Sequence, residues 1–341
     1  MTGRQPAGRR PRSGKLAHLA PERTLRRLEL QVTRRLDGLL NGEHLGLIPG
    51  PGTELAEARL YQPGEDDVRH MDWAVTARTT TPHVRDLIAD HELEAWALVD
   101  LTPSMDFGTE TMIKRDLAVA ALAAVGFLTV RLGDRVGAYL LHRDGMRRRP
   151  ARTGKAAMYA LLQAVLDAQS VHDGAHRTGP APAAPRDLAA AVTSLDRGQT
   201  RRGLRVIISD FLAPDGDDPA DGPHGRPGWE RPLRRLAARH QVLAIEIIDP
   251  RELDLPDVGL VEMADPETGT VHEIVLSRRV RERYAAAAAA QRERTRAALR
   301  RTGAHHLVLR TDRDWIADVA RFALRQRRAA GRHANTAGVR P

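Results

Sequence analysis

Apolar residues follow two different periods along this chain. Short apolar runs bounded by charged or turn-forming residues predict buried strands near residues 96–99, 136–142, 204–209, 241–248 and 306–310. Longer segments of helical period or continuous apolar character lie between and after them, at 111–132, 155–168, 187–195, 232–239, 279–301 and 315–324. This alternation predicts an α/β fold with a doubly wound, mostly parallel sheet. Residues 260–263 and 271–275 predict a hairpin.

The N-terminal part shows a different organisation. Residues 21–40 place Leu25, Leu28, Val32 and Leu36 on one stripe, which predicts an amphipathic helix docked on the sheet layer. Glycines and prolines at 41–53 end this helix, and residues 54–93 predict a polar, irregular, ordered module packed on the sheet. We therefore divide the chain into a disordered basic tail (1–20), an N-terminal helix and module (21–93), an α/β domain (94–328) and a disordered tail (329–341).

Composition limits the classes of function. The chain has 341 residues, 42% of them hydrophobic, and no cysteine, which excludes disulfides, thiolate metal sites and cysteine nucleophiles. The net charge of +9 belongs to the two ends, because residues 1–37 hold ten basic and three acidic residues, and residues 321–341 hold six arginines and no acid. Such ends could bind nucleic acid, but they lack interleaved aromatic residues for base stacking, which favours solvated tails.

Neither a signal segment nor a membrane span is predicted. The longest apolar run, at 117–128, is too short to cross a bilayer, so we expect a soluble, cytoplasmic protein. The Thr-Gly-Lys-Ala sequence at 153–156 lacks the earlier glycine and the following hydroxyl of a phosphate-binding loop. Any ATP hydrolysis is therefore expected from a partner.

Oxygen-bearing side chains follow two of the predicted strands. Asp100, Thr102 and Ser104 come directly after the strand at 96–99, and Asp210 follows the strand at 204–209. In a parallel sheet, ligands gather at the carboxyl ends of the strands, so we expect these residues to meet. Carboxylate and hydroxyl oxygens are ligands of hard cations, which predicts a Mg²⁺ or other divalent-cation site. The alternative is that the aspartates only cap the following helices.

A longer motif precedes this site. Residues 59–73 read RLYQPGEDDVRHMDW, followed by Ala77-Arg78-Thr79 and Pro82-His83-Val84-Arg85. The ordered string resembles the signature of the domain-of-unknown-function 58 family and continues through Ser104 to Gly108. We interpret this module either as a recognition surface or as an ion-pair network that supports the edge of the sheet. Its candidate residues are Arg59, Tyr61, Asp66, Asp67, Arg69, Asp72, Trp73, Arg78 and Arg85.

The strand and loop at 94–104 resemble a von Willebrand factor A-like domain with its metal-dependent adhesion site. Asp100, Ser104 and Asp210 match the motif of that site, and Thr102 keeps the oxygen of its first serine. The later threonine of the motif is not matched, because the corresponding run is Pro-Arg-Asp-Leu at 185–188; Thr178 could replace it only if the loop folds back. A positive Arg186 beside the site would disfavour a cation.

The family resemblance implies a protein that binds other proteins and has no catalytic turnover. It implies a MoxR-type AAA+ ATPase as partner, in the assembly or activation of an unknown client protein, with one acidic side chain of the partner completing the metal's coordination. No small-molecule substrate is expected. Two alternatives stay open: a magnesium-dependent phosphotransferase of the haloacid dehalogenase type with Asp100 as nucleophile, and nucleic-acid binding through the basic ends.

Overall fold

The computed structural model describes most of the chain. The described residues are 21–39, 58–62, 71, 73–85, 94–109, 112–131, 133–173, 187–212, 226–264 and 271–337. Across them, no helix combines the length and the apolar character that crossing a bilayer requires.

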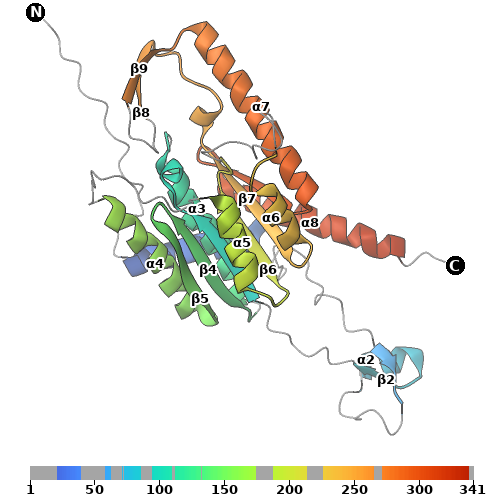
Figure 1. Cartoon of the computed structure of the whole chain (residues 1–341). Helices are drawn as coiled ribbons and strands as arrows, with labels where there is room; N and C mark the ends of the chain where they lie inside the picture. Colours follow the sequence, from blue (N-terminus) through green and yellow to red (C-terminus); the bar gives the residue numbers. More distant parts are fainter. Residues whose placement is uncertain are drawn as a thin grey trace, which may run out of the picture.

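A six-stranded sheet forms the centre of the molecule (Figure 1). Its spatial order is β10-β7-β6-β3-β4-β5, and all neighbours are parallel except the edge pair β4 and β5. The strands are β3 (Glu94–Asp100), β4 (Arg135–His142), β5 (Gly145–Arg152), β6 (Leu204–Ser209), β7 (Gln241–Ile248) and β10 (His305–Arg310). The predicted doubly wound, mostly parallel sheet is confirmed.

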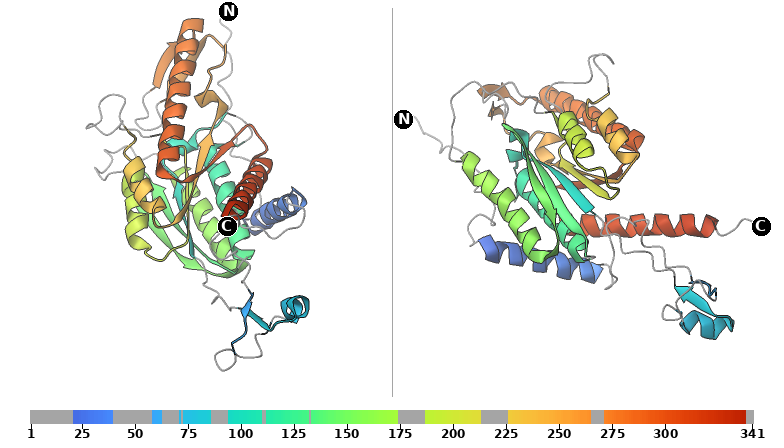
Figure 2. Two further views of the ribbon diagram at one scale, coloured as in Figure 1. Left: turned by 90° about the vertical axis from the view of Figure 1, so that its right-hand side faces the viewer. Right: turned by 60° about the horizontal axis from the view of Figure 1, so that its bottom comes forward.

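Helices cover both faces of this sheet (Figures 1 and 2). One core contains side chains of α3 (Lys114–Arg131), α4 (Gly154–Asp173) and α8 (Trp315–Ala337). The other contains side chains of α5 (Leu188–Gly198), α6 (Glu230–Ala237) and α7 (Arg278–Thr302). The central strands are apolar on both sides because both of their faces are buried.

The order in which strands are added to the sheet reverses between β3 and β6. From β3 the chain first builds β4 and β5 on one side, and then returns to add β6, β7 and β10 on the other. Such a switch point opens a crevice at the carboxyl ends of the two strands, where open α/β sheets bind their ligands. Asp100 ends β3, and Asp210 directly follows β6, so both lie at this place.

The N-terminal helix α1 (Pro21–Leu39) adds a further layer outside α3, α4 and α8. Leu28, Val32 and Leu36 are buried, as the apolar stripe predicts. The Glu29 carboxylate ties this helix to α4, because it pairs with Lys155 at 3.0 Å and accepts a hydrogen bond from the Tyr159 hydroxyl.

The upstream module is arranged differently from our prediction. Strands β1 (Ala58–Leu60) and β2 (His83–Arg85) pair antiparallel, with α2 (Trp73–Thr79) between them in the chain. Figures 1 and 2 show this small unit set apart from the six-stranded sheet, whereas we expected the module to pack on it.

Two other elements differ from the sequence prediction. The edge strand β5 was not predicted, because its Met-Arg-Arg-Arg run carries no apolar alternation. Helix α8 continues to Ala337, so residues 329–337 are helical where a disordered tail is predicted. Residues 1–20 and 338–341 lie outside the described residues.

The predicted hairpin forms beyond the carboxyl edge of the sheet. Strands β8 (Leu260–Ala264) and β9 (Val271–Val275) pair antiparallel and lie near the first turns of α7 (Figure 1). The Tyr284 hydroxyl on α7 donates a hydrogen bond to the Arg251 carbonyl at 3.3 Å. This contact ties α7 to the segment that follows β7.

Candidate functional site

The loop after β3 is shaped by Asp100. Its Oδ1 accepts hydrogen bonds from the Thr102 amide at 3.0 Å and from the Thr102 hydroxyl at 2.6 Å. The hydroxyl oxygens of Thr102 and Ser104 lie 3.3 Å apart. The loop then forms a short 3-10 helix, η2 (Pro103–Asp106). Asp100, Thr102 and Ser104 are thus brought together, as predicted.

Arg115 on α3 contacts the same loop at two points. Its guanidinium donates to the Leu101 carbonyl at 3.1 Å and pairs with Asp106 at 2.6 Å. The arginine side chain is nearly buried, while the Asp106 side chain is about half exposed.

The loop after β6 is joined to Asp100 through Ser209. The Ser209 hydroxyl donates to Asp100 Oδ2 at 2.7 Å and accepts a hydrogen bond from the Phe211 amide at 3.0 Å. Phe211 adopts a left-handed backbone, φ 56°, which a bulky residue adopts only when its surroundings compensate the strain. Its ring packs edge-on against Trp229, with ring centroids 5.2 Å apart.

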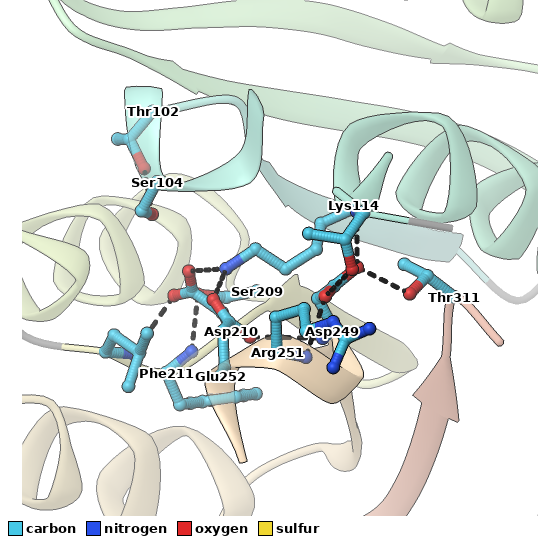
Figure 3. Close-up of polar contacts among 12 residues, drawn as sticks. Thr102, Ser104, Lys114, Ser209, Asp210, Phe211, Asp249, Arg251, Glu252 and Thr311 are labelled. Atoms are coloured by element: carbon cyan, nitrogen blue, oxygen red, sulfur yellow. Dashed lines mark hydrogen bonds and ion pairs between the residues drawn. The ribbon is translucent and has the colours of Figure 1, made fainter. Parts of the chain in front are cut away.

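Asp210 is turned toward a buried cation. Lys114 Nζ donates to Asp210 Oδ2 at 2.8 Å and also contacts the Glu252 carboxylate. Asp210 Oδ1 accepts a hydrogen bond from the Leu212 amide at 3.0 Å. In Figure 3 the ammonium group of Lys114 points at Asp210 and Glu252, while Thr102 and Ser104 lie to one side.

A third aspartate extends the network along the sheet edge. Asp249 follows β7 and accepts hydrogen bonds from the Thr109 hydroxyl at 2.7 Å, the Thr311 hydroxyl at 2.8 Å and the Arg251 amide at 2.9 Å. Its own amide donates to the Glu252 carboxylate at 3.1 Å, which closes a capping box on the short helix η4 (Pro250–Glu252). The ends of β3, β6, β7 and β10 are therefore connected by polar contacts that are buried or partly buried.

Burial and charge set the protonation of these groups. Burial and, next, repulsion from Asp210 raise the pKa of Asp100 to about 6. Hydrogen bonds from Thr102 and Ser209 lower this pKa but do not outweigh the rise. Burial also raises the pKa of Glu252, and attraction to Lys114 offsets only part of that rise. For Lys114, burial lowers the pKa, but attraction to Asp210 and Glu252 outweighs it and the net pKa is raised. Lys114 is therefore charged.

The four predicted ligands do not fit one divalent-cation site. Every carboxylate oxygen of Asp100 and Asp210 already accepts a hydrogen bond. A divalent ion on Asp210 would share that carboxylate with an ammonium group 2.8 Å away, and like charges repel. Among the described residues, no three acidic, histidine or cysteine side chains form a group that could hold a metal.

The other predicted residues are placed as follows. Thr178 and Arg186 lie outside the described residues, as do Asp66, Asp67, Arg69 and Asp72. Arg59 and Arg85 lie on the paired strands β1 and β2, and Tyr61 follows β1, with its amide bonded to the Pro82 carbonyl at 2.9 Å. Trp73 begins α2 and is exposed, and Arg78 lies in the last turn of that helix. The role of this unit stays a prediction.

Sequence reasoning missed most side chains of the network. They are Thr109, Lys114, Ser209, Asp249, Glu252 and Thr311. Lys114 did carry a signal, because a lysine at the start of a helix that is apolar all round needs a buried partner. Glu252 carried a weaker one, because it is the third residue after Asp249, which follows a strand and precedes a proline.

Comparisons with known proteins agree with the resemblance seen in the sequence. Residues 57–294 match the family described as "Protein of unknown function DUF58". "Uncharacterized protein Rv1480" of Mycobacterium tuberculosis (strain ATCC 25618 / H37Rv) is 52% identical over 307 residues, which is 90% of each chain. "Uncharacterized protein MAV169" of Mycobacterium avium is 44% identical over 186 residues, covering 54% of this chain and 97% of that protein.

Solved structures that match part of this chain include one VWA domain. The conserved hypothetical protein BatB from Bacteroides thetaiotaomicron matches 69% of this chain and 99% of its own, with 16% identity and a TM-score of 0.36. The SpRpn10 VWA domain matches 67% of this chain and 93% of its own, with 12% identity and a TM-score of 0.30. The match to the family over residues 57–294 covers most of the chain, and the chain therefore belongs to the DUF58 family.

Proposed function

We propose that this chain is a non-catalytic protein-binding component that acts with a MoxR-type AAA+ ATPase in the assembly or activation of client proteins. The partner docks at the carboxyl edge of the sheet, on the loops after β3 and β6. The observation that carries this proposal is the pair of large apolar side chains that these loops leave exposed. Phe107 is 39% exposed and Leu212 is 43% exposed, although both loops are held by buried contacts.

The loops combine the features of a docking surface. Exposed aromatic and aliphatic anchors next to polar groups supply most of the energy of protein interfaces. Thr102 and Ser104, which are partly buried, provide hydroxyl groups in the loop after β3. The resemblance to an adhesion domain supports the same edge as the place of binding.

In the described parts of both loops, residues 101–109 and 210–212, hydrogen bonds hold the backbone. The Phe107 carbonyl accepts the Lys114 amide at 2.9 Å, and the Leu212 amide donates to Asp210 at 3.0 Å. A surface that is rigid before binding loses little conformational entropy when a partner docks, which favours affinity. These two hydrogen bonds fix the backbone beside the exposed side chains.

The environment of Asp100 argues against the phosphotransferase alternative. A nucleophilic carboxylate must present a free oxygen to its substrate. Asp100 is 5% exposed, and both of its oxygens accept hydrogen bonds from the protein. The acidic pair Asp217-Asp218, which that alternative would need, lies outside the described residues.

A pull-down with a purified MoxR-type ATPase tests the proposal. We expect the ATPase to be retained by the wild-type chain and lost when Phe107→Ala and Leu212→Ala are combined. Leu30→Ala is the matched control, because Leu30 is a large exposed apolar residue on α1, away from this edge. Equal retention by all three proteins would show that the partner does not use the two loops.

A further inference from the structure

Lys114 is unusual among the charged residues of this chain. Its side chain is 0% exposed, and it begins a helix whose next two turns lie in the apolar core. An unpaired ammonium group at such depth would be neutral or would unfold its surroundings. Two carboxylates compensate it, Asp210 at 2.8 Å and Glu252.

The two carboxylates come from different parts of the sheet edge. Asp210 follows β6, and Glu252 belongs to η4 after β7. Through Glu252 the ammonium group also reaches Asp249, which accepts a hydrogen bond from Thr311 after β10 (Figure 3). Asp249 also accepts a hydrogen bond from Thr109 in the loop after β3. One positive charge on α3 therefore joins the segments that follow β6 and β7 and, through hydrogen bonds, those that follow β3 and β10.

We infer that the ammonium group of Lys114 is the resident cation of this edge, in the role that the family resemblance gives to a divalent metal. It neutralises Asp210 and joins the strand ends, so the edge assembles without metal and is not stabilised by divalent ions. Unlike a metal, the ammonium group is fixed to the chain and is buried, so it cannot coordinate a partner's carboxylate. A partner therefore meets the exposed side chains of the loops.

This inference concerns the site itself and does not depend on the identity of the partner. It can be correct where the ATPase proposal fails, and the reverse also holds. The experiment below uses the full chain alone, so the two failures are distinguishable.

The first test is thermal unfolding of the wild-type chain in EDTA, in Mg²⁺ and in Mn²⁺. We expect the three unfolding temperatures to agree within about 1 °C, because a ligand stabilises only a protein that it binds. An ion present at a hundredfold excess over its Kd would raise the unfolding temperature by roughly 5–10 °C. A saturable rise of that size, absent from Asp210→Ala, would overturn the inference.

The second test removes the charge of Lys114. We expect Lys114→Met to lower the unfolding temperature by roughly 6–20 °C, because it leaves buried carboxylates without a counter-ion. Lys155→Met is the matched control, since Lys155 pairs with Glu29 on the surface with a side chain that is mostly exposed, and it should shift the temperature little. Equal unfolding of the two variants would contradict the inference.

The third variant distinguishes charge from packing. Lys114→Met combined with Asp210→Asn and Glu252→Gln removes all three charges, and we expect it to recover part of the loss. If Lys114→Met does not fold, the triple variant and the wild-type metal series still decide the question. A triple variant no more stable than the single one would show that Lys114 acts by packing, and would overturn its role as the cation.

Discussion

The hydroxyl of Ser209 donates to Asp100 Oδ2 at 2.7 Å and joins the ends of β3 and β6, the two parallel strands at which the strand order reverses. The same oxygen accepts the amide of Phe211, the residue with the left-handed backbone. One buried hydroxyl thus positions both loops of the proposed docking surface.

Replacing Ser209 by alanine should destabilise the chain. The change leaves Asp100 Oδ2 and the Phe211 amide without their partner in a buried place, and we expect a loss of about 1–3 kcal/mol in the free energy of unfolding. Urea unfolding followed by circular dichroism measures it. Ser194→Ala is the control, because Ser194 is exposed and only bonds to the Ala190 carbonyl within α5. A loss no larger than that of the control would contradict the role of Ser209.

The raised pKa of Asp100 makes stability depend on pH. Because its folded pKa is about 6 and the ordinary value is 3.8, the folded chain binds this proton more tightly than the unfolded chain. This group therefore lowers the stability as pH rises from about 4 to about 6, and its full cost is present above that range. Asp100→Asn cannot titrate, so its stability relative to the wild type should increase across this window by roughly 1–3 kcal/mol.

Urea unfolding of both proteins at several pH values checks this prediction. When the free energies of unfolding of the two proteins are subtracted at each pH, the contributions of all other groups cancel to first order. A difference that stays constant from pH 4 to pH 7 would show that Asp100 titrates as an ordinary aspartate.

Thr311→Val tests the outer part of the network. Burial raises the pKa of Asp249, but hydrogen bonds from Arg251, Thr109 and Thr311 outweigh it, so the net pKa is lowered. The lowered pKa adds stability above the ordinary pKa of aspartate, and this stability is lost as pH falls through the folded pKa. Valine keeps the shape of threonine and removes one donor, so we expect a loss of about 1–3 kcal/mol at neutral pH and a smaller loss in acid.

The control for this variant is Thr193→Val, which removes a hydroxyl bonded to the Ala189 carbonyl within α5. Chemical unfolding at neutral pH and in acid compares the two. If Thr311→Val were as stable as the control at neutral pH, the contact with Asp249 would carry no weight in the fold.

Leu36→Ala tests whether α1 is part of the folded body. Leu36 is buried and belongs to the core shared with α3, α4 and α8. Removing its side chain should cost about 2–5 kcal/mol in the free energy of unfolding, the usual range for a buried leucine. Leu30→Ala, on an exposed part of the same helix, should cost far less. Similar losses for both variants would mean that α1 does not pack as described.

Much of the fold could be predicted from the sequence, because its signals are local. Strand β7 and the hairpin of β8 and β9 follow directly from apolar runs and turn residues. Strand β5 could not be predicted, because it contains consecutive arginines. It therefore has neither the apolar run nor the alternation of apolar and polar residues that indicates a strand. The late part of α8 was missed because its basic, polar composition is also typical of a solvated tail.

Only the part of the site that has a local signal in the sequence could be predicted. Aspartates after buried strands are visible in the sequence, and strand order brings Asp100 and Asp210 to the same edge. What each carboxylate contacts depends on long-range packing, because Lys114 and Glu252 are separated by more than a hundred residues of chain. Spacing alone could not show that the cation beside Asp210 is a lysine.

The most direct test of the central claim is the Kd of a MoxR-type ATPase for this chain, measured by isothermal titration. The account predicts saturable binding by the wild type, the same Kd in EDTA and in Mg²⁺, and at least about tenfold weaker binding when Phe107→Ala and Leu212→Ala are combined. Leu30→Ala should bind like the wild type. Binding that is unchanged in the double variant, or that requires a divalent ion, would contradict the account.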